Sequence, residues 1–162
     1  MPGHYLGRNR IGSLPRQTVL MDLPAAHDDV GRTLVETMSF SVACGVEVDA
    51  AGAEEVRGRM AWRDDRCTAG GVLHGGALMT LADSLGAICA FLNLPEGAST
   101  STVESKTNFM RAVTAGTARA TTRPLHVGRQ TIVLQTEIRD DADKLVAFVT
   151  QTQAVLRPRG GS

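Results

Sequence analysis

The chain has 162 residues, of which 43% are hydrophobic and 21% charged, so it is long enough for one domain with a substantial core. Its 17 Lys and Arg residues balance its 17 Asp and Glu residues, which argues against a nucleic-acid-binding protein and against an acidic disordered tail. Three scattered cysteines without a CxxC spacing indicate reduced thiols in a cytoplasmic protein, and they disfavour both a disulfide framework and a zinc site.

The N-terminal segment, residues 1–22, mixes Gly, Pro and Arg with neither a helical nor a strand period, and we expect a flexible arm. It lacks the pattern of a secretory signal peptide, although three arginines before the first acidic residue leave a transit peptide open. Residues 24–40 keep helical spacing and predict a short amphipathic helix. From Phe40 the pattern changes to period two, so residues 40–48 and 54–62 predict a pair of strands joined by a turn.

The most informative stretch runs from Gly70 to Leu94 and predicts a long helix from about His74 to about Leu92. One face repeats apolar residues at three- and four-residue spacing, namely Leu78, Leu81, Ala82, Leu85, Ile88, Cys89 and Leu92. The opposite face carries small residues and Asp83, so we expect the helix to be buried all round. A membrane span is disfavoured, because a central carboxylate costs about 2.5 to 3.5 kcal/mol on insertion scales and no aromatic or basic belt flanks the run.

After this helix the sequence predicts four strands, at about residues 100–110, 116–125, 130–139 and 144–156. No helical segment lies between them, so the sheet is expected to be mainly antiparallel and the fold class to be α+β. We expect a frayed tail at residues 158–162, which leaves a single domain at 23–157. Serine-hydrolase, nucleotide and zinc-protease chemistry are disfavoured because the GxSxG, Walker, GxGxxG and HExxH motifs are missing.

Asp83 needs an explanation, because a buried carboxylate is costly unless it is paired or used in chemistry. A structural hydrogen-bonding role and a catalytic role both stay open. Gly75 and Gly76 lie at the predicted helix N-terminus, where free backbone N–H groups and the helix dipole can stabilise an oxyanion. Gly75 and Asp83 are separated by about 12 Å along the helix axis, too far to act on one carbonyl. If they serve one reaction, two antiparallel helices must meet in a two-fold dimer.

The segment LHGGALMTLADSLGA resembles the hotdog-fold acyl-CoA thioesterases of the PaaI-like branch. The resemblance continues through STVESKTNFMRAV, GTARATTRPLHVGR and VAFVTQTQAVL, and so covers about residues 45–156. The latter half looks especially like thioesterases that act on aromatic acyl-CoAs, including those that release 1,4-dihydroxy-2-naphthoate. The resemblance implies a hotdog fold, an antiparallel sheet of five to six strands wrapped around one long central helix. It also implies a homodimer or a dimer of dimers, with an acyl-CoA substrate and no metal or other cofactor.

The resemblance also implies roles for single residues. Asp83 matches the catalytic carboxylate, acting as general base or as nucleophile, and the Asp stands where some relatives have Glu. Gly75 matches the backbone oxyanion donor. His74 matches the histidine that shapes the glycine loop, with a helix-capping role equally open. Thr102 falls where the family has a hydroxyl that orients the attacking water, although a plain strand threonine fits as well.

Thr68 occupies a place where the family commonly has Asn or Gln, and its shorter hydroxyl reaches less far toward the thioester. Arg111 and Arg129 are candidates for the CoA phosphates, because Arg suits bidentate phosphate contacts, and Gly76 is a further candidate for CoA binding. By default, each Arg is a solvated residue at a strand end. Two other functions stay open: a hydratase or dehydratase of acyl-CoA or acyl carrier protein, and a module that binds acyl-CoA without turnover. The acyl group itself, aromatic or medium-chain, is not determined by the sequence.

Overall fold

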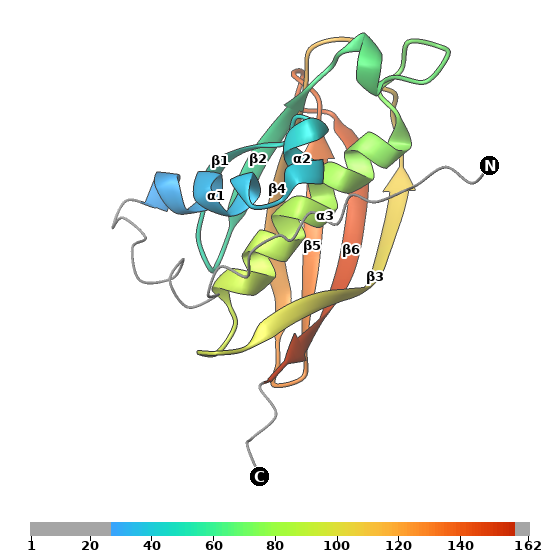
Figure 1. Ribbon diagram of the computed structural model, residues 1–162. Helices are drawn as coiled ribbons and strands as arrows, with labels where there is room; N and C mark the ends of the chain where they lie inside the picture. The colour runs from blue at the N-terminus through green and yellow to red at the C-terminus, as the bar shows by residue number, and fades with distance from the viewer. Residues whose placement is uncertain (1–26, 158–162) are drawn as a thin grey trace, which may run out of the picture.

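A six-stranded antiparallel sheet curves around one long helix in the computed structural model, which describes residues 27–157 (Figure 1). The arm expected at residues 1–22 and the tail expected at residues 158–162 lie outside the described residues. The strands are neighbours in the order β1-β2-β4-β5-β6-β3. In chain order the elements are α1 (His27–Glu36), α2 (Ser39–Ala43), β1 (Glu47–Ala51), β2 (Val56–Ala61), a 3-10 turn (Asp64–Arg66), α3 (Gly75–Leu92), β3 (Ser99–Phe109), β4 (Thr117–Val127), β5 (Thr131–Arg139) and β6 (Leu145–Leu156). The α+β class and the central helix expected from the sequence are confirmed.

The helix α3 lies along the inner face of the sheet because one of its own faces is continuously apolar (Figure 1). The expected stripe is buried from Leu78 to Cys89 and packs against core residues of the strands such as Met60 and Leu134. By length and composition α3 could span a bilayer, but half of its residues are buried inside the chain, as in the core helix of a sheet protein. The sheet therefore accounts for the apolar character of this helix.

The opposite face of α3 is not covered by residues 27–157. Gly76 is exposed, Asp83 is half-buried, and 39% of the Met79 surface is accessible. The expectation that α3 is buried all round is therefore wrong for the described part of a single chain. Of the described elements, α1 packs against β1 and α3, α2 packs against α1 and α3, and the sheet lies on the other side of α3 (Figure 1).

The segment before β1 differs from the prediction. We expected one helix up to residue 40 and a strand from Phe40, whereas two short helices, α1 and α2, occupy residues 27–43. Gly45, with φ +74°, ends α2 and turns the chain into β1. Phe40 and Val42 are 69% and 49% exposed, so their alternation does not mark a core-facing strand. The strand prediction is right only from Glu47 onward.

A close approach between α3 and the sheet depends on Gly58 of β2. A Cβ atom at this position would lie 2.8 Å from Leu85 Cδ2 of α3 and 2.5 Å from the carbonyl oxygen of Glu47. The Gly58→Ala variant should therefore lose about 1 to 3 kcal/mol of unfolding free energy through overpacking, measured by urea denaturation. Gly52→Ala is the matched control, because its Cβ would meet only the Glu55 carbonyl oxygen at an ordinary 3.5 Å. Equal stability of the two variants would contradict this account of the helix–sheet contact.

Candidate active site

Asp83 lies half-buried in the third turn of α3, where two donors from the sheet reach its carboxylate. Its Oδ1 atom accepts a hydrogen bond from Nε2 of Gln151 on β6, and a second from Oγ1 of Thr102 on β3 at 3.3 Å. Within residues 27–157 no donor is bonded to Oδ2. One oxygen of the carboxylate is therefore held in place while the other is available for chemistry.

A bulge in β3 aims Thr102 at the helix. Val103 has no partner in the pairing of β3 with β6, and such an extra residue changes which side chains face the core. Thr102 Oγ1 accepts a hydrogen bond from Gln153 Nε2 at 2.8 Å, and Gln153 Oε1 in turn accepts one from Thr100 Oγ1 at 3.0 Å. A hydroxyl has a single proton, and Thr102 donates its proton in the hydrogen bond to Asp83. In this arrangement Thr102 therefore holds the carboxylate and has no proton left to donate to a water.

His74 caps the N-terminus of α3. Its backbone is extended, with φ −62° and ψ 137°, and its Nδ1 atom accepts a hydrogen bond from the Gly76 N–H at 2.8 Å. The N–H of Gly75 has no acceptor among the described residues. We expected free donors at both glycines, and this is wrong for Gly76, because its N–H already donates to the His74 ring. Gly75 remains as an open donor at the positive end of the helix dipole.

The loop that leads to Gly75 is fixed by hydrogen bonds at several points. Trp62 Nε1 donates to the Gly71 carbonyl at 2.9 Å, and the His74 N–H donates to the Arg66 carbonyl at 2.8 Å. Thr68 is exposed on this loop, and its Oγ1 only accepts a long, 3.4 Å hydrogen bond from a neighbouring loop amide. The chain therefore does not bring Thr68 to the carboxylate of Asp83.

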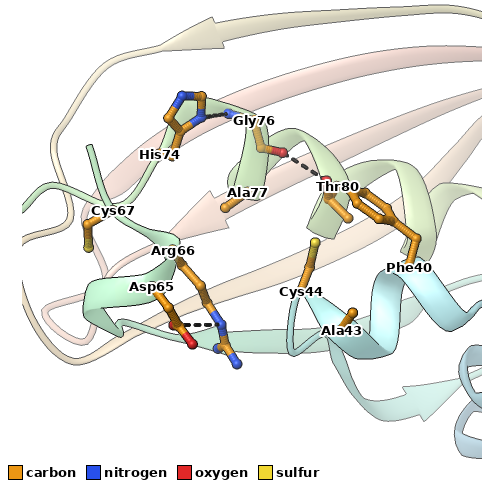
Figure 2. A pocket seen from close by; sticks show the side chains of 10 residues that line it. All are labelled: Phe40, Ala43, Cys44, Asp65, Arg66, Cys67, His74, Gly76, Ala77 and Thr80. Atoms are coloured by element: carbon orange, nitrogen blue, oxygen red, sulfur yellow. Dashed lines mark hydrogen bonds and ion pairs between the residues drawn. The ribbon is translucent and has the colours of Figure 1, made fainter. Parts of the chain in front are cut away.

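A cavity of about 390 Å³ opens between α2 and the first turns of α3 (Figure 2). Its walls include Phe40, Cys44, Arg66, His74, Gly76 and Thr80. Thr80 lies one turn before Asp83 on the same side of α3, so the cavity adjoins the face that carries the carboxylate. The hollow is therefore placed to hold part of a ligand that also reaches the helix N-terminus.

The three cysteines are free thiols, and the surroundings of two of them disfavour the thiolate form. Burial raises the pKa of Cys89 to about 11. Desolvation and the negative charges of Asp64 and Asp65 raise the pKa of Cys67, which lies in the wall of the cavity. Neither thiol has the electropositive surroundings of a nucleophilic cysteine. In the described part of the chain, no group of three or more His, Cys, Asp or Glu side chains could hold a metal ion.

Arg111 and Arg129 lie at opposite ends of the sheet. The backbone N–H of Arg111 donates to the Val146 carbonyl near the start of β6. Arg129 instead lines a second cavity, of about 260 Å³, together with Val155 near the end of β6. Nine residues of strand separate these two points on β6, which corresponds to about 30 Å. One chain therefore does not bring the two arginines to a single phosphate group.

Gln151 and Gln153 belong to the site but were missed in the sequence. Both are only 1% exposed, and they follow Ala147 and Val149 on the core-facing side of β6. The period of two along the predicted strand would have placed these long polar side chains in the core, where each needs a hydrogen-bond partner. The sequence QTQ at residues 151–153 carries that signal.

Comparisons with known proteins show which family the chain resembles. The profile of the thioesterase superfamily matches residues 70–147. A Bacillus subtilis protein named ComA2 is 31% identical over 131 residues, which cover 80% of this chain and 98% of that protein. The 1,4-dihydroxy-2-naphthoyl-CoA hydrolase of Escherichia coli is 34% identical over 86 residues, which cover 53% of this chain and 63% of the hydrolase.

The fold is also that of solved thioesterase structures. The crystal structure of a thioesterase from Haemophilus influenzae superposes with a TM-score of 0.75 and 26% sequence identity, covering 83% of this chain and 93% of that one. Sequence similarity along nearly the whole of ComA2 and structural similarity along most of the chain point to the same family. The chain therefore belongs to the thioesterase superfamily and has the hotdog fold that its sequence resembles.

Proposed function

We propose that this protein is an acyl-CoA thioesterase that hydrolyses its substrate to a free acid and CoA. The observation that carries the proposal is the Asp83 carboxylate, whose Oδ1 is held by two donors and whose Oδ2 is open on the uncovered face of α3. Membership of the thioesterase superfamily supports thioester hydrolysis as the reaction. Similarity to the Escherichia coli hydrolase supports a CoA thioester with a fused aromatic acyl group as the first substrate to test.

The chemistry needs only Asp83, Gly75 and water. Oδ2 either attacks the thioester carbonyl carbon or takes a proton from a water that attacks it. As the new C–O bond forms, the carbonyl oxygen becomes an oxyanion, which the Gly75 N–H stabilises at the positive end of α3. Collapse of this intermediate breaks the C–S bond, and the CoA thiolate leaves and takes up a proton. In the first route a water then hydrolyses the acyl-aspartyl anhydride.

The two groups must come from two chains, because about 12 Å of helix separates Gly75 from Asp83. We therefore propose a two-fold dimer in which two antiparallel α3 helices pair through their uncovered faces. The sheet edge supports this arrangement: among residues 27–157, β3 pairs only with β6, and its Val103 and Phe109 side chains are 66% and 50% exposed. A second copy of the chain would cover both the edge strand and the Asp83 face.

The same pairing gives a role to the two arginines. In an antiparallel dimer, Arg111 of one chain and Arg129 of the other lie at the same end of the assembly, so the pair could bind the phosphates of one CoA molecule. Pairing of dimers into a tetramer and a cytoplasmic location stay predictions from the sequence.

Replacing Asp83 tests the proposed reaction. The Asp83→Asn variant should lose about a hundredfold or more of turnover with an unchanged thermal melt, because Asn has a similar shape but neither attacks a carbonyl nor accepts a proton. Thiol release would be measured with benzoyl-, phenylacetyl-, hexanoyl-, palmitoyl- and 1,4-dihydroxy-2-naphthoyl-CoA. Asp143→Asn is the matched control, since Asp143 is exposed in the β5–β6 turn at φ 59°, a conformation that Asn tolerates.

Undiminished turnover by the Asp83→Asn variant would overturn the catalytic role of Asp83. A folded wild-type protein that turns over none of the thioesters would instead favour one of the two other functions, a module that binds acyl-CoA without turnover or a hydratase or dehydratase. Binding of acyl-CoA without thiol release, followed by calorimetry, would identify the first of these.

Gly75→Pro tests the oxyanion donor. Proline is tolerated at the first helical position, and the extended backbone of His74 suits the residue before a proline, so the change removes the N–H with little disturbance of α3. We expect kcat to fall about a hundred- to thousandfold. Gly75→Ala is the control, because it keeps the N–H while its Cβ meets Phe109 Cζ at 3.1 Å. Equal losses in both variants would attribute the effect to crowding by Phe109.

Mixing the two inactive variants tests the two-chain site. A dimer of one Asp83→Asn chain and one Gly75→Pro chain contains one site in which both Gly75 and Asp83 are intact. Unfolding and refolding an equimolar mixture should restore about a quarter of the wild-type activity, since about half of the dimers are mixed and each has one good site. No recovery, with mixed dimers verified by mass spectrometry, would overturn the shared site.

A further inference from the structure

The amide of Gln151 is buried in a single, chemically fixed orientation. The side chain is 1% exposed, and only its Nε2 can face the Asp83 carboxylate, because an amide oxygen would be repelled by it. Its Oε1 is consequently turned away and is one of the few buried side-chain oxygens without a hydrogen-bond partner in the described part of the chain. A buried unsatisfied oxygen is costly to a fold and therefore needs an explanation.

Gly86 makes the room for this amide. It lies three residues after Asp83 on α3, and a Cβ atom at this position would overlap Gln151 Oε1 and lie 2.8 Å from Gln151 Cδ. Glycine is less favourable than alanine in the interior of a helix. The chain thus carries two unfavourable features, a glycine in its central helix and an unpaired amide oxygen. Both accompany the position of the Gln151 amide, in which the Nε2–H group faces Asp83.

We infer that Gln151 is a positioning residue for Asp83, and that Gly86 acts by admitting the Gln151 amide to the surface of α3. Nε2 fixes Oδ1, so that Oδ2 is the oxygen presented to the thioester or to water. The other hydrogen bond to Oδ1, from Thr102, is long at 3.3 Å, and Thr102 is an exposed residue of an edge strand. The buried Gln151 side chain is therefore the better anchored of the two donors. This inference rests on the proposed function and extends it to two residues that do not touch the substrate.

Gln151→Met is the first test, because methionine fills similar space without an N–H donor. We expect kcat to fall about ten- to a hundredfold, since a misplaced reactive group costs rate more than binding, while KM changes by less than about twofold. The melting temperature should stay equal or rise, because the unpaired oxygen is removed. A residue with a merely structural role would lower the melting temperature and leave kcat unchanged, and that result would overturn the inference.

Thr136→Val is the stability control. The hydroxyl of Thr136 on β5 shares a buried 2.7 Å hydrogen bond with the hydroxyl of Thr122 on β4. Its removal leaves the Thr122 hydroxyl unpaired and does not touch Asp83 or its donors. The variant should melt at lower temperature and keep the wild-type kcat. A loss of kcat comparable to that of Gln151→Met would show that kcat follows general stability, which overturns the positioning role.

A double-mutant cycle tests the link between Gly86 and Gln151. Gly86→Ala should lower kcat in the wild-type protein, because the new methyl group displaces the amide, and should lower it no further in the Gln151→Ala protein, where that space is empty. Equal losses in both backgrounds would overturn the role given to Gly86.

These experiments distinguish a failure of the proposed function from a failure of the positioning inference. If Asp83→Asn retains wild-type turnover, or the wild type has none, the proposed function fails and the inference with it. If Asp83→Asn is inactive while Gln151→Met keeps full kcat, the positioning inference alone fails.

Discussion

A carboxylate on an otherwise apolar helix must find hydrogen-bond donors, and the site follows from how Asp83 finds them. The helix α3 offers it none, so both donors come from the sheet that curves around the helix. Gln151 reaches Asp83 from β6 over Gly86, and Thr102 reaches it from β3 by way of a bulge. The curvature of the sheet, the bulge and the glycine in the helix are therefore parts of one solution to one electrostatic requirement.

The length of α3 imposes the second constraint. Its N-terminus holds an open backbone donor at Gly75, while Asp83 lies more than two turns away along the same helix. In the proposed reaction, the two groups therefore have to come from different chains. The edge strand β3 is involved twice, because it supplies Thr102 and also leaves an unpaired, partly apolar edge beside the same helix face. In the proposed dimer, this one strand would contribute both to the Asp83 site and to the contact between chains.

The sequence predicted those elements whose patterns are local. The bounds of α3 and the strands from β2 to β6 followed from clear periodicity, and the glycines before α3 marked its start. The strand expected from Phe40 failed, because exposed apolar side chains on a short helix produce the same alternation as a buried strand. The partnership of Asp83 with Gln151 could not be read locally, since it depends on how β6 and α3 are aligned in space. The capping of Gly76 by His74 depended likewise on one ring orientation.

The contact between Asp83 and Gln151 has a consequence for related chains. The resemblance read from the sequence implies that some relatives carry a glutamate where Asp83 stands, and that side chain is longer by one methylene group. A longer carboxylate would run into the amide that is lodged against Gly86, whereas a shorter residue at 151 would leave Asp83 without its buried donor. The lengths of the side chains at 83 and 151 are therefore complementary. Across the family these two positions, together with 86, are expected to covary.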